Sequence, residues 1–322
     1  MTVESSSQML LQAVTSLKSQ IATKNFPSNR QLIEICKEHF VNLIDVKNES
    51  HRIHDILETA VNLYLFENYA DSVNKNKYET LEKLENLAQK LPTQSWRDDE
   101  QTIYQQYSTP PALAFVMCEL LKPAKDSIAL EPSAGTGLLA NWLKIARCRV
   151  EVNEISKRRR QLLELQGYNP YSHNAEFLDD LLDPEIKPDF ILMNPPFSAS
   201  GGRTKKRDTS FGFRHVESAL LRLNPGGRLV CLLGADGCLK TDKGKSFWNR
   251  IGREYKVHCF LVVAPKAFYK HGTTFQTVVI IIDKLPLSQI ANSQDNNKTQ
   301  TIEFCSLKEM LQFSDVFNST NF

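Results

Sequence analysis

The sequence predicts an α/β protein in which a region of helices precedes a parallel sheet that carries helices on both faces. Two observations predict this fold class. Apolar residues recur at helical spacing through about the first 95 residues, and from about residue 125 short apolar runs alternate with helical segments. The runs expected to form strands are 127–130, 149–152, 190–193, 229–233, 258–263 and 277–282.

The N-terminal region is expected to form a small helical domain. Ser28 is a candidate N-cap followed by apolar residues on one helix face, and the same spacing returns over 53–64. The stretch 89–95 resembles a linker, since it combines a proline with several polar residues. We therefore expect a helical accessory domain over 1–95 and a larger α/β domain over 96–322.

Length, charge and cysteine usage narrow the class of protein. The 322 residues are 41% apolar, and the net charge of +2 does not by itself indicate a nucleic-acid binder. The seven cysteines are scattered and none forms a C-x2-C pair, so neither a disulfide framework nor a zinc site is predicted. His51 and His54 are expected to be surface histidines, and no metal site is predicted. Without a signal peptide or a membrane-spanning run, we expect a cytoplasmic protein with no membrane partner.

A glycine-containing turn follows the first predicted strand, where residues 130–137 read LEPSAGTG. Gly135 and Gly137 lack the Cβ atom that would keep a nucleotide-like ligand away from the backbone. Together with Ala140 they also satisfy a weak dinucleotide fingerprint, so NAD is an open alternative at this point.

Two acids lie close to this turn. Glu154 ends the next predicted strand, where a carboxylate can accept hydrogen bonds from both hydroxyls of a ribose in either cofactor class. Glu131 stands immediately before the turn and is placed to face a ligand ammonium group. An ammonium group would fit a methionine moiety and not NAD.

The tetrad Asn194-Pro195-Pro196-Phe197 directly follows the strand predicted over 190–193. Two prolines fix the backbone and hold its carbonyl groups in place. An amino group conjugated with a ring or a carbonyl is a poor nucleophile, and it needs acceptors for its two N–H bonds. The Asn194 side-chain oxygen and the Pro195 carbonyl can supply both, while Phe197 offers a flat face for stacking a base.

The order of these motifs resembles class I N6-adenine methyltransferases, and the match spans about residues 104–284, including QYSTP at 106–110. The resemblance implies a Rossmann-like seven-stranded sheet and S-adenosyl-L-methionine as the cofactor. It implies that Thr109 and Pro110 contact the methionine end of the cofactor and that Glu154 binds its ribose. The implied cofactor-binding residues are Tyr107, Thr109, Pro110, Glu131, Pro132, Ala134, Gly135, Gly137, Glu154, Glu176 and Phe177.

Glu176 and Phe177 follow a further strand predicted near 171–175. They resemble the acid that binds the cofactor adenine in this family and the aromatic residue beside it. The family more often has Asp at the position of Glu176.

The function implied is methyl transfer to N6 of adenine in DNA. Adenine in RNA and a protein glutamine are alternative substrates, because protein-glutamine methyltransferases also pair a helical N-terminal domain with an Asn-Pro-Pro-aromatic tetrad. Thr109-Pro110 and Phe197 favour the adenine enzymes. An alternative of another class is a non-catalytic cofactor-binding partner of a helicase or nuclease.

The segment 194–203 also resembles methylase-like modules that accompany strawberry-notch-type helicases, so a helicase or nuclease is a candidate partner. About 38 residues follow position 284, which leaves no room for a substantial target-recognition domain. Basic residues follow the tetrad and are expected to meet phosphates of the nucleic acid. They are Arg203, Lys205, Lys206 and Arg207.

Overall fold

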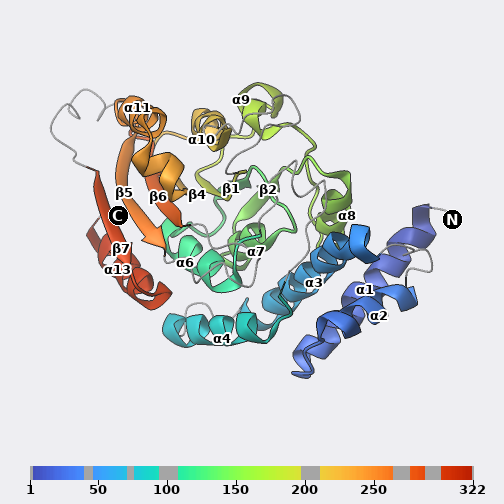
Figure 1. The fold of residues 1–322 in the computed structure, drawn as a ribbon. Coiled ribbons are helices and arrows are strands. Elements are labelled where there is room, and N and C mark those ends of the chain that lie inside the picture. Colours follow the sequence, from blue (N-terminus) through green and yellow to red (C-terminus); the bar gives the residue numbers. More distant parts are fainter. Residues whose placement is uncertain are drawn as a thin grey trace.

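The computed structural model describes residues 3–39, 46–70, 76–93, 108–196, 211–263, 276–286 and 299–320. The N-terminal region contains four helices in these ranges: α1 (Val3–Ala22), α2 (Asn29–His39), α3 (Val46–Tyr69) and α4 (Lys77–Lys90) (Figure 1). Ser28 caps α2 as predicted, because its hydroxyl accepts from the Gln31 backbone N–H at 3.4 Å and its own N–H donates to the Gln31 side chain at 2.9 Å. The helical interpretation of the N-terminal region is confirmed for the described residues.

The α/β part is built on one seven-stranded sheet of strand order β2-β1-β3-β4-β6-β5-β7. Six of its strands agree with the predicted runs to within two residues at each end. The strands are β1 (Ile128–Glu131), β2 (Arg149–Val152), β3 (Phe190–Met193), β4 (Arg228–Gly234), β5 (Lys256–Val263), β6 (Thr277–Asp283) and β7 (Gln300–Phe304).

The prediction of an entirely parallel sheet is wrong at β6. This strand pairs antiparallel with both of its neighbours, β4 and β5. Six of its seven residues are buried, so it presents a continuous apolar run that has the same pattern in either direction. The apolar pattern therefore carries no information about the direction of the strand.

The strand predicted near 171–175 is also wrong. Only a single bridge forms there, between Tyr171 and Asn153, and the chain then enters a 3-10 helix, η1 (Ala175–Phe177). The Asn153 side chain accepts from the His173 N–H at 2.8 Å and donates to the His173 carbonyl at 3.0 Å. A side chain thus takes the hydrogen bonds that a strand ladder would need. The seventh strand is instead β7, which was not predicted and lies parallel to β5 at the sheet edge.

Helices cover both faces of the sheet. On one face α6 (Pro111–Leu121), α7 (Leu138–Ile145), α8 (Lys157–Leu165) and α13 (Leu307–Thr320) pack on the strands, and α1–α4 belong to the same buried apolar cluster. On the other face α9 (Leu178–Leu181), α10 (Phe211–Arg222) and α11 (Asp242–Ile251) form a second cluster. Figure 1 shows α3 and α4 along the outer side of α6 and α7, which they contact. Of the helices in the described ranges, none combines the length and the apolarity that crossing a bilayer would need.

Candidate active site

The glycine turn joins the end of β1 to the start of α7, and its backbone requires glycine. Gly135 has a φ angle of 56° and Gly137 one of 93°, in the left-handed region that other residues rarely adopt. A Cβ atom at position 137 would lie 2.7 Å from Cδ2 of Leu163 on α8. The turn therefore approaches α8 closely, and its close approach to a ligand stays a prediction.

Glu154 follows β2, the strand next to β1, and its carboxylate is held against the glycine turn. One oxygen accepts from the Gly135 N–H at 2.7 Å and the other from the Ser156 N–H at 2.8 Å. Burial raises the pKa of Glu154, and the nearby Arg159 guanidinium opposes this shift. Each oxygen retains a lone pair for a further donor, as ribose binding would require.

Glu131 ends β1 and points into the first turn of α7. Its Oε2 accepts from the Ala140 N–H at 2.6 Å, and the residue is 2% exposed. Burial raises the pKa of this carboxyl well above its usual range. Its position favours a structural role at the helix terminus, and contact with a ligand ammonium stays a prediction.

Asn194 directly follows β3, as predicted, and is bonded to the segment that leads into α6. Its Nδ2 donates to Oγ1 of the buried Thr109 at 2.9 Å. Pro110 is the N-cap residue of α6 and Pro195 is buried. Two motifs that are 85 residues apart in the chain are thereby joined at one edge of the sheet.

The adenine-binding candidates lie on η1. Asn174 caps this turn by accepting from the Glu176 N–H at 3.1 Å. The Glu176 side chain is buried and its Oε2 lies 3.4 Å from Nη1 of Arg214. The Phe177 side chain is 47% exposed, an uncommon degree of exposure for a large aromatic ring in this chain.

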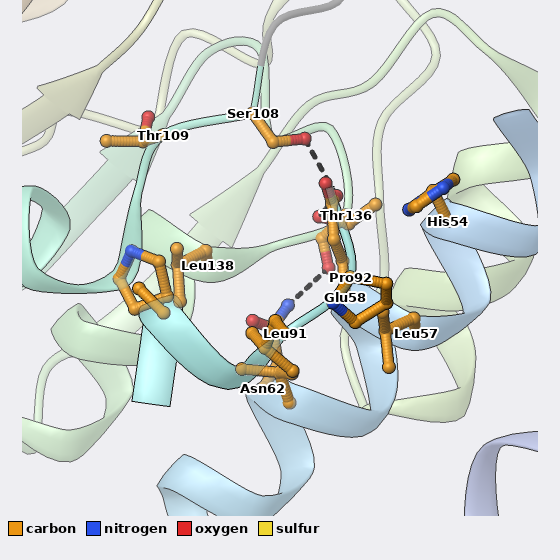
Figure 2. Close-up of a pocket in the computed structure, with 13 residues that line it drawn as sticks. His54, Leu57, Glu58, Asn62, Leu91, Pro92, Ser108, Thr109, Thr136 and Leu138 are labelled. Carbon is orange, nitrogen blue, oxygen red and sulfur yellow. Dashed lines mark hydrogen bonds between the residues drawn. The ribbon is translucent and has the colours of Figure 1, made fainter. Parts of the chain in front are cut away.

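Sequence reasoning missed two polar residues of α3 that reach the glycine turn between β1 and α7 (Figure 2). Oε2 of Glu58 accepts from the hydroxyl of Ser108 at 2.7 Å and from that of Thr136 at 2.8 Å. Nδ2 of Asn62 donates to the Thr136 backbone oxygen at 2.8 Å. Helix α3 therefore contacts both the glycine turn and the segment before α6.

Asp55, one turn earlier on α3, is a third missed residue. It accepts from Nη2 and Nε of Arg159 on α8, at 2.9 Å and 3.3 Å, and both residues are buried. The available signal was a narrow polar stripe, at positions 55, 58, 59 and 62, beside the apolar residues of the same helix. Such a stripe usually faces solvent, but here it faces the α/β part of the chain.

His54 lies on the same side of α3, where it lines a pocket with Glu58 and Thr109. The prediction that it is a surface histidine is wrong, because the residue is only 8% exposed. Its surface is covered since α3 packs against α7 and α8 rather than standing in solvent. Among the residues that the structure describes, no group of three His, Cys, Asp or Glu side chains is arranged to hold a metal ion.

Several predicted site residues lie outside the described ranges, and their roles stay predictions. They are Tyr107, Phe197, Arg203, Lys205, Lys206 and Arg207. The remaining predicted residues occupy the carboxyl ends of β1, β2 and β3 or the segments next to them.

No protein-family profile matches this chain, and no curated protein matches its sequence. Solved structures do resemble it. A Listeria monocytogenes protein described as a class I S-adenosylmethionine-dependent methyltransferase gives a TM-score of 0.51 at 14% identity over 98% of each chain. The methyltransferase subunit of a type I restriction-modification system from Streptococcus thermophilus gives 0.52 at 13% identity, over 94% of this chain and 73% of that one.

TrmN from Thermus thermophilus is matched at 19% identity with a TM-score of 0.43, over 58% of this chain. This chain spans about half of TrmN, 52% of its length. At sequence identities this low, the similarity to these structures supports a shared fold and nothing further. The predicted fold class, a Rossmann-like seven-stranded sheet of the class I methyltransferase type, is confirmed.

Proposed function

We propose that this chain is a methyltransferase that uses S-adenosyl-L-methionine and acts on the N6 amino group of adenine in DNA. The observation that carries the proposal is the hydrogen bond between Asn194 and Thr109 at the carboxyl end of β3. Glu154 and the glycine turn lie at the same edge of the sheet. In open α/β sheets this edge is where ligands bind.

The residues present fit this cofactor. Gly135 and Gly137 leave the backbone of the turn open, and Glu154 retains lone pairs for two ribose hydroxyls. Oε2 of Glu176 is buried and accepts no hydrogen bond from the described residues. The Arg214 guanidinium lies 3.4 Å from this oxygen, and the amino group of the cofactor adenine would supply the hydrogen bond that a buried acceptor usually has.

When bound, S-adenosylmethionine supplies a methyl group on a positively charged sulfur, so the nucleophile needs alignment more than a strong base. Nδ2 of Asn194 donates to Thr109, which holds the side-chain amide in place at the end of β3. Oδ1 and the Pro195 carbonyl would accept the two N–H bonds of the substrate amino group and direct its lone pair outward. Fixed acceptors of this kind favour the transition state, because they need no reorganisation during the reaction.

Adenine in DNA is proposed as the substrate because the tetrad at 194–197 resembles that of class I N6-adenine methyltransferases. Phe197 would stack an adenine taken out of its helix, and the basic residues between 203 and 207 would meet the flanking phosphates. Adenine in RNA and the side-chain amide of a protein glutamine carry the same kind of nitrogen, and they are the alternative outcomes of the test.

The test is a transfer assay with radiolabelled S-adenosylmethionine and three acceptors: duplex DNA, RNA and a glutamine-containing release-factor-like protein. We expect label in DNA, recovered as N6-methyladenine after digestion. Label only in RNA or protein would move the assignment to that substrate. Calorimetry that detects binding of NADH but neither S-adenosylmethionine nor S-adenosylhomocysteine would remove the cofactor and the function together.

A further inference from the structure

A pocket lies between α3, the end of α4 and the two segments that lead into α6 and α7 (Figure 2). Its walls are mostly apolar, with Leu57 and Val61 from α3, Leu91 after α4 and Leu138 at the start of α7. Its polar side is formed by Glu58 with the hydroxyl residues before α6 and in the glycine turn. The N-terminal helices therefore supply half of the lining.

Glu58 is the one acid among the residues that line this pocket. Oε2 is occupied by the hydroxyls of Ser108 and Thr136, and no described residue donates to Oε1. Burial and the neighbouring Asp55 raise the pKa of Glu58 to about 7, although Arg159 and the two hydroxyls oppose the shift. A cation bound at Oε1 would stabilise the charged form of this half-buried carboxylate.

The pocket adjoins the proposed active site at two points. Thr109 forms part of its wall and binds Asn194, the proposed acceptor of the substrate amino group. Thr136, another wall residue, follows Gly135, which donates to Glu154, the proposed ribose ligand. The pocket thus lies beside the place where the transferred methyl would be held, on the side of α3.

S-adenosylmethionine extends beyond its sulfur as an amino-acid arm that ends in an ammonium and a carboxylate. With the ribose at Glu154 and the sulfur within reach of Asn194, this arm needs a separate place. Glu131 is turned into α7 and bonded to Ala140, so it offers little to the arm. Glu58 is the acid that borders a cavity.

The resemblance already implies that the methionine end of the cofactor contacts Thr109, which lines this pocket. Building on the proposed function, we infer that Glu58 of α3 binds the ammonium group of this amino-acid arm. The methylene groups of the arm lie against Leu138 and Pro111, and the ammonium donates to the free oxygen of Glu58. Helix α3, which lies outside the sheet and its covering helices, is then part of the cofactor site.

The test compares three ligands by calorimetry on the wild type and on Glu58→Gln. S-adenosylhomocysteine carries the whole arm, its deamino analogue has hydrogen in place of the α-amino group, and 5′-methylthioadenosine lacks the arm. Glutamine keeps an oxygen for the hydroxyls of Ser108 and Thr136, so the fold is preserved. Glu67→Gln is the matched control, because Glu67 lies on the same helix and pairs with Lys18 at the surface.

We expect Glu58→Gln to weaken S-adenosylhomocysteine binding by about tenfold or more, the scale of a charge-assisted hydrogen bond. The affinity for the other two ligands should change by less than about twofold. Glu67→Gln should leave the affinity for all three ligands unchanged. An equal loss for all three ligands, or no loss at all, would overturn the role of Glu58 while the cofactor assignment stands. A wild type that binds none of the three would overturn both.

Discussion

Buried carboxylates lie at opposite edges of the sheet, and the two edges differ in what their carboxylates are bonded to. At the edge away from the candidate site, Asp283 at the end of β6 receives two hydrogen bonds from Arg228, at 2.7 and 2.9 Å, and lies 2.7 Å from Nε2 of His258. Burial alone would raise the pKa of Asp283, but these partners hold it below its ordinary value. This carboxylate is fully paired inside the protein.

The carboxylates of the site edge are bonded differently. Glu58, Glu131 and Glu154 receive hydrogen bonds from backbone N–H groups and hydroxyls, and no lysine or arginine side chain donates to them among the described residues. Burial raises the pKa of all three. At one edge the carboxylate is paired with side chains of the protein and stabilises the fold. At the other edge the carboxylates lack a basic side-chain donor within the described ranges, so a ligand could pair with them.

The largest expected effect is on stability and comes from Arg228→Met. This change leaves Asp283 with His258 as its remaining partner in a buried network, so we expect a loss of about 3–5 kcal/mol in the free energy of unfolding. Urea unfolding at neutral pH measures it. Arg250→Met is the control, because its ion pair with Glu217 is half-exposed, and it should cost less than about 1 kcal/mol. Similar losses for both variants would erase the contrast between buried and exposed pairs.

At the site edge the largest effect should fall on turnover. Asn194→Ala removes one preorganised acceptor, and we expect methyl transfer to slow by about a hundredfold while cofactor affinity stays within about threefold. The loss of its bond to Thr109 should cost about 1 kcal/mol of stability or less. Single-turnover kinetics with bound cofactor measure the chemical step. Wild-type turnover in this variant would contradict the role given to Asn194.

A smaller effect is expected where α3 meets the glycine turn. Asn62→Ala removes one donor to the Thr136 carbonyl, but Nε2 of Gln166 still donates to that oxygen at 2.9 Å. Because the acceptor is not left without a partner, we expect a cost of only about 1 kcal/mol in thermal or urea unfolding. Asn68→Ala on the exposed end of the same helix should cost about 0.5 kcal/mol or less. A loss several times larger for Asn62 would mean that this contact organises the whole turn.

A last effect concerns the pH dependence of stability and has opposite signs at the two edges. The raised pKa of Glu58, about 7, means that its contribution to stability is present below the unfolded value of 4.5 and is lost as pH rises through about 7. The lowered pKa of Asp283 gives a contribution that is present above its ordinary value of 3.8 and is lost as pH falls through the native value. Unfolding free energies across pH should therefore fall less steeply between about pH 5 and 7.5 in Glu58→Gln than in the wild type. An unchanged slope would contradict the shift assigned to Glu58.

The sequence was most informative where residue chemistry and strand ends coincide. The runs that became β1 to β6 are apolar and bounded by turn residues, so their positions could be predicted to within two residues. Asn194 could be placed because it follows directly on β3, and Gly137 because its type suits the turn that joins β1 to α7. The pairing direction of β6 could not be predicted, since its continuous apolar run has the same pattern in either direction.

The contribution of α3 was missed for a different reason. Asp55 and Asn62 have the spacing of a solvent-facing stripe, and their partners Arg159 and Thr136 lie 104 and 74 residues further along the chain. A pattern within one helix contains no record of contacts at that separation. The Asn153 side chain, which replaces a strand ladder by bonding His173, could not be anticipated for the same reason.

The shared apolar cluster of α1–α4 and one sheet face also constrains the order in which the chain can fold during synthesis. Leu57 and Val61 leave the ribosome long before α7 and α8, against which α3 is packed. At about 5–20 residues per second, the 104 residues that separate Asp55 from Arg159 take about 5–20 s to translate. For that interval the side of α3 that packs against α7 and α8 has no partner from the sheet part of the chain, so we expect the nascent chain to expose apolar surface there.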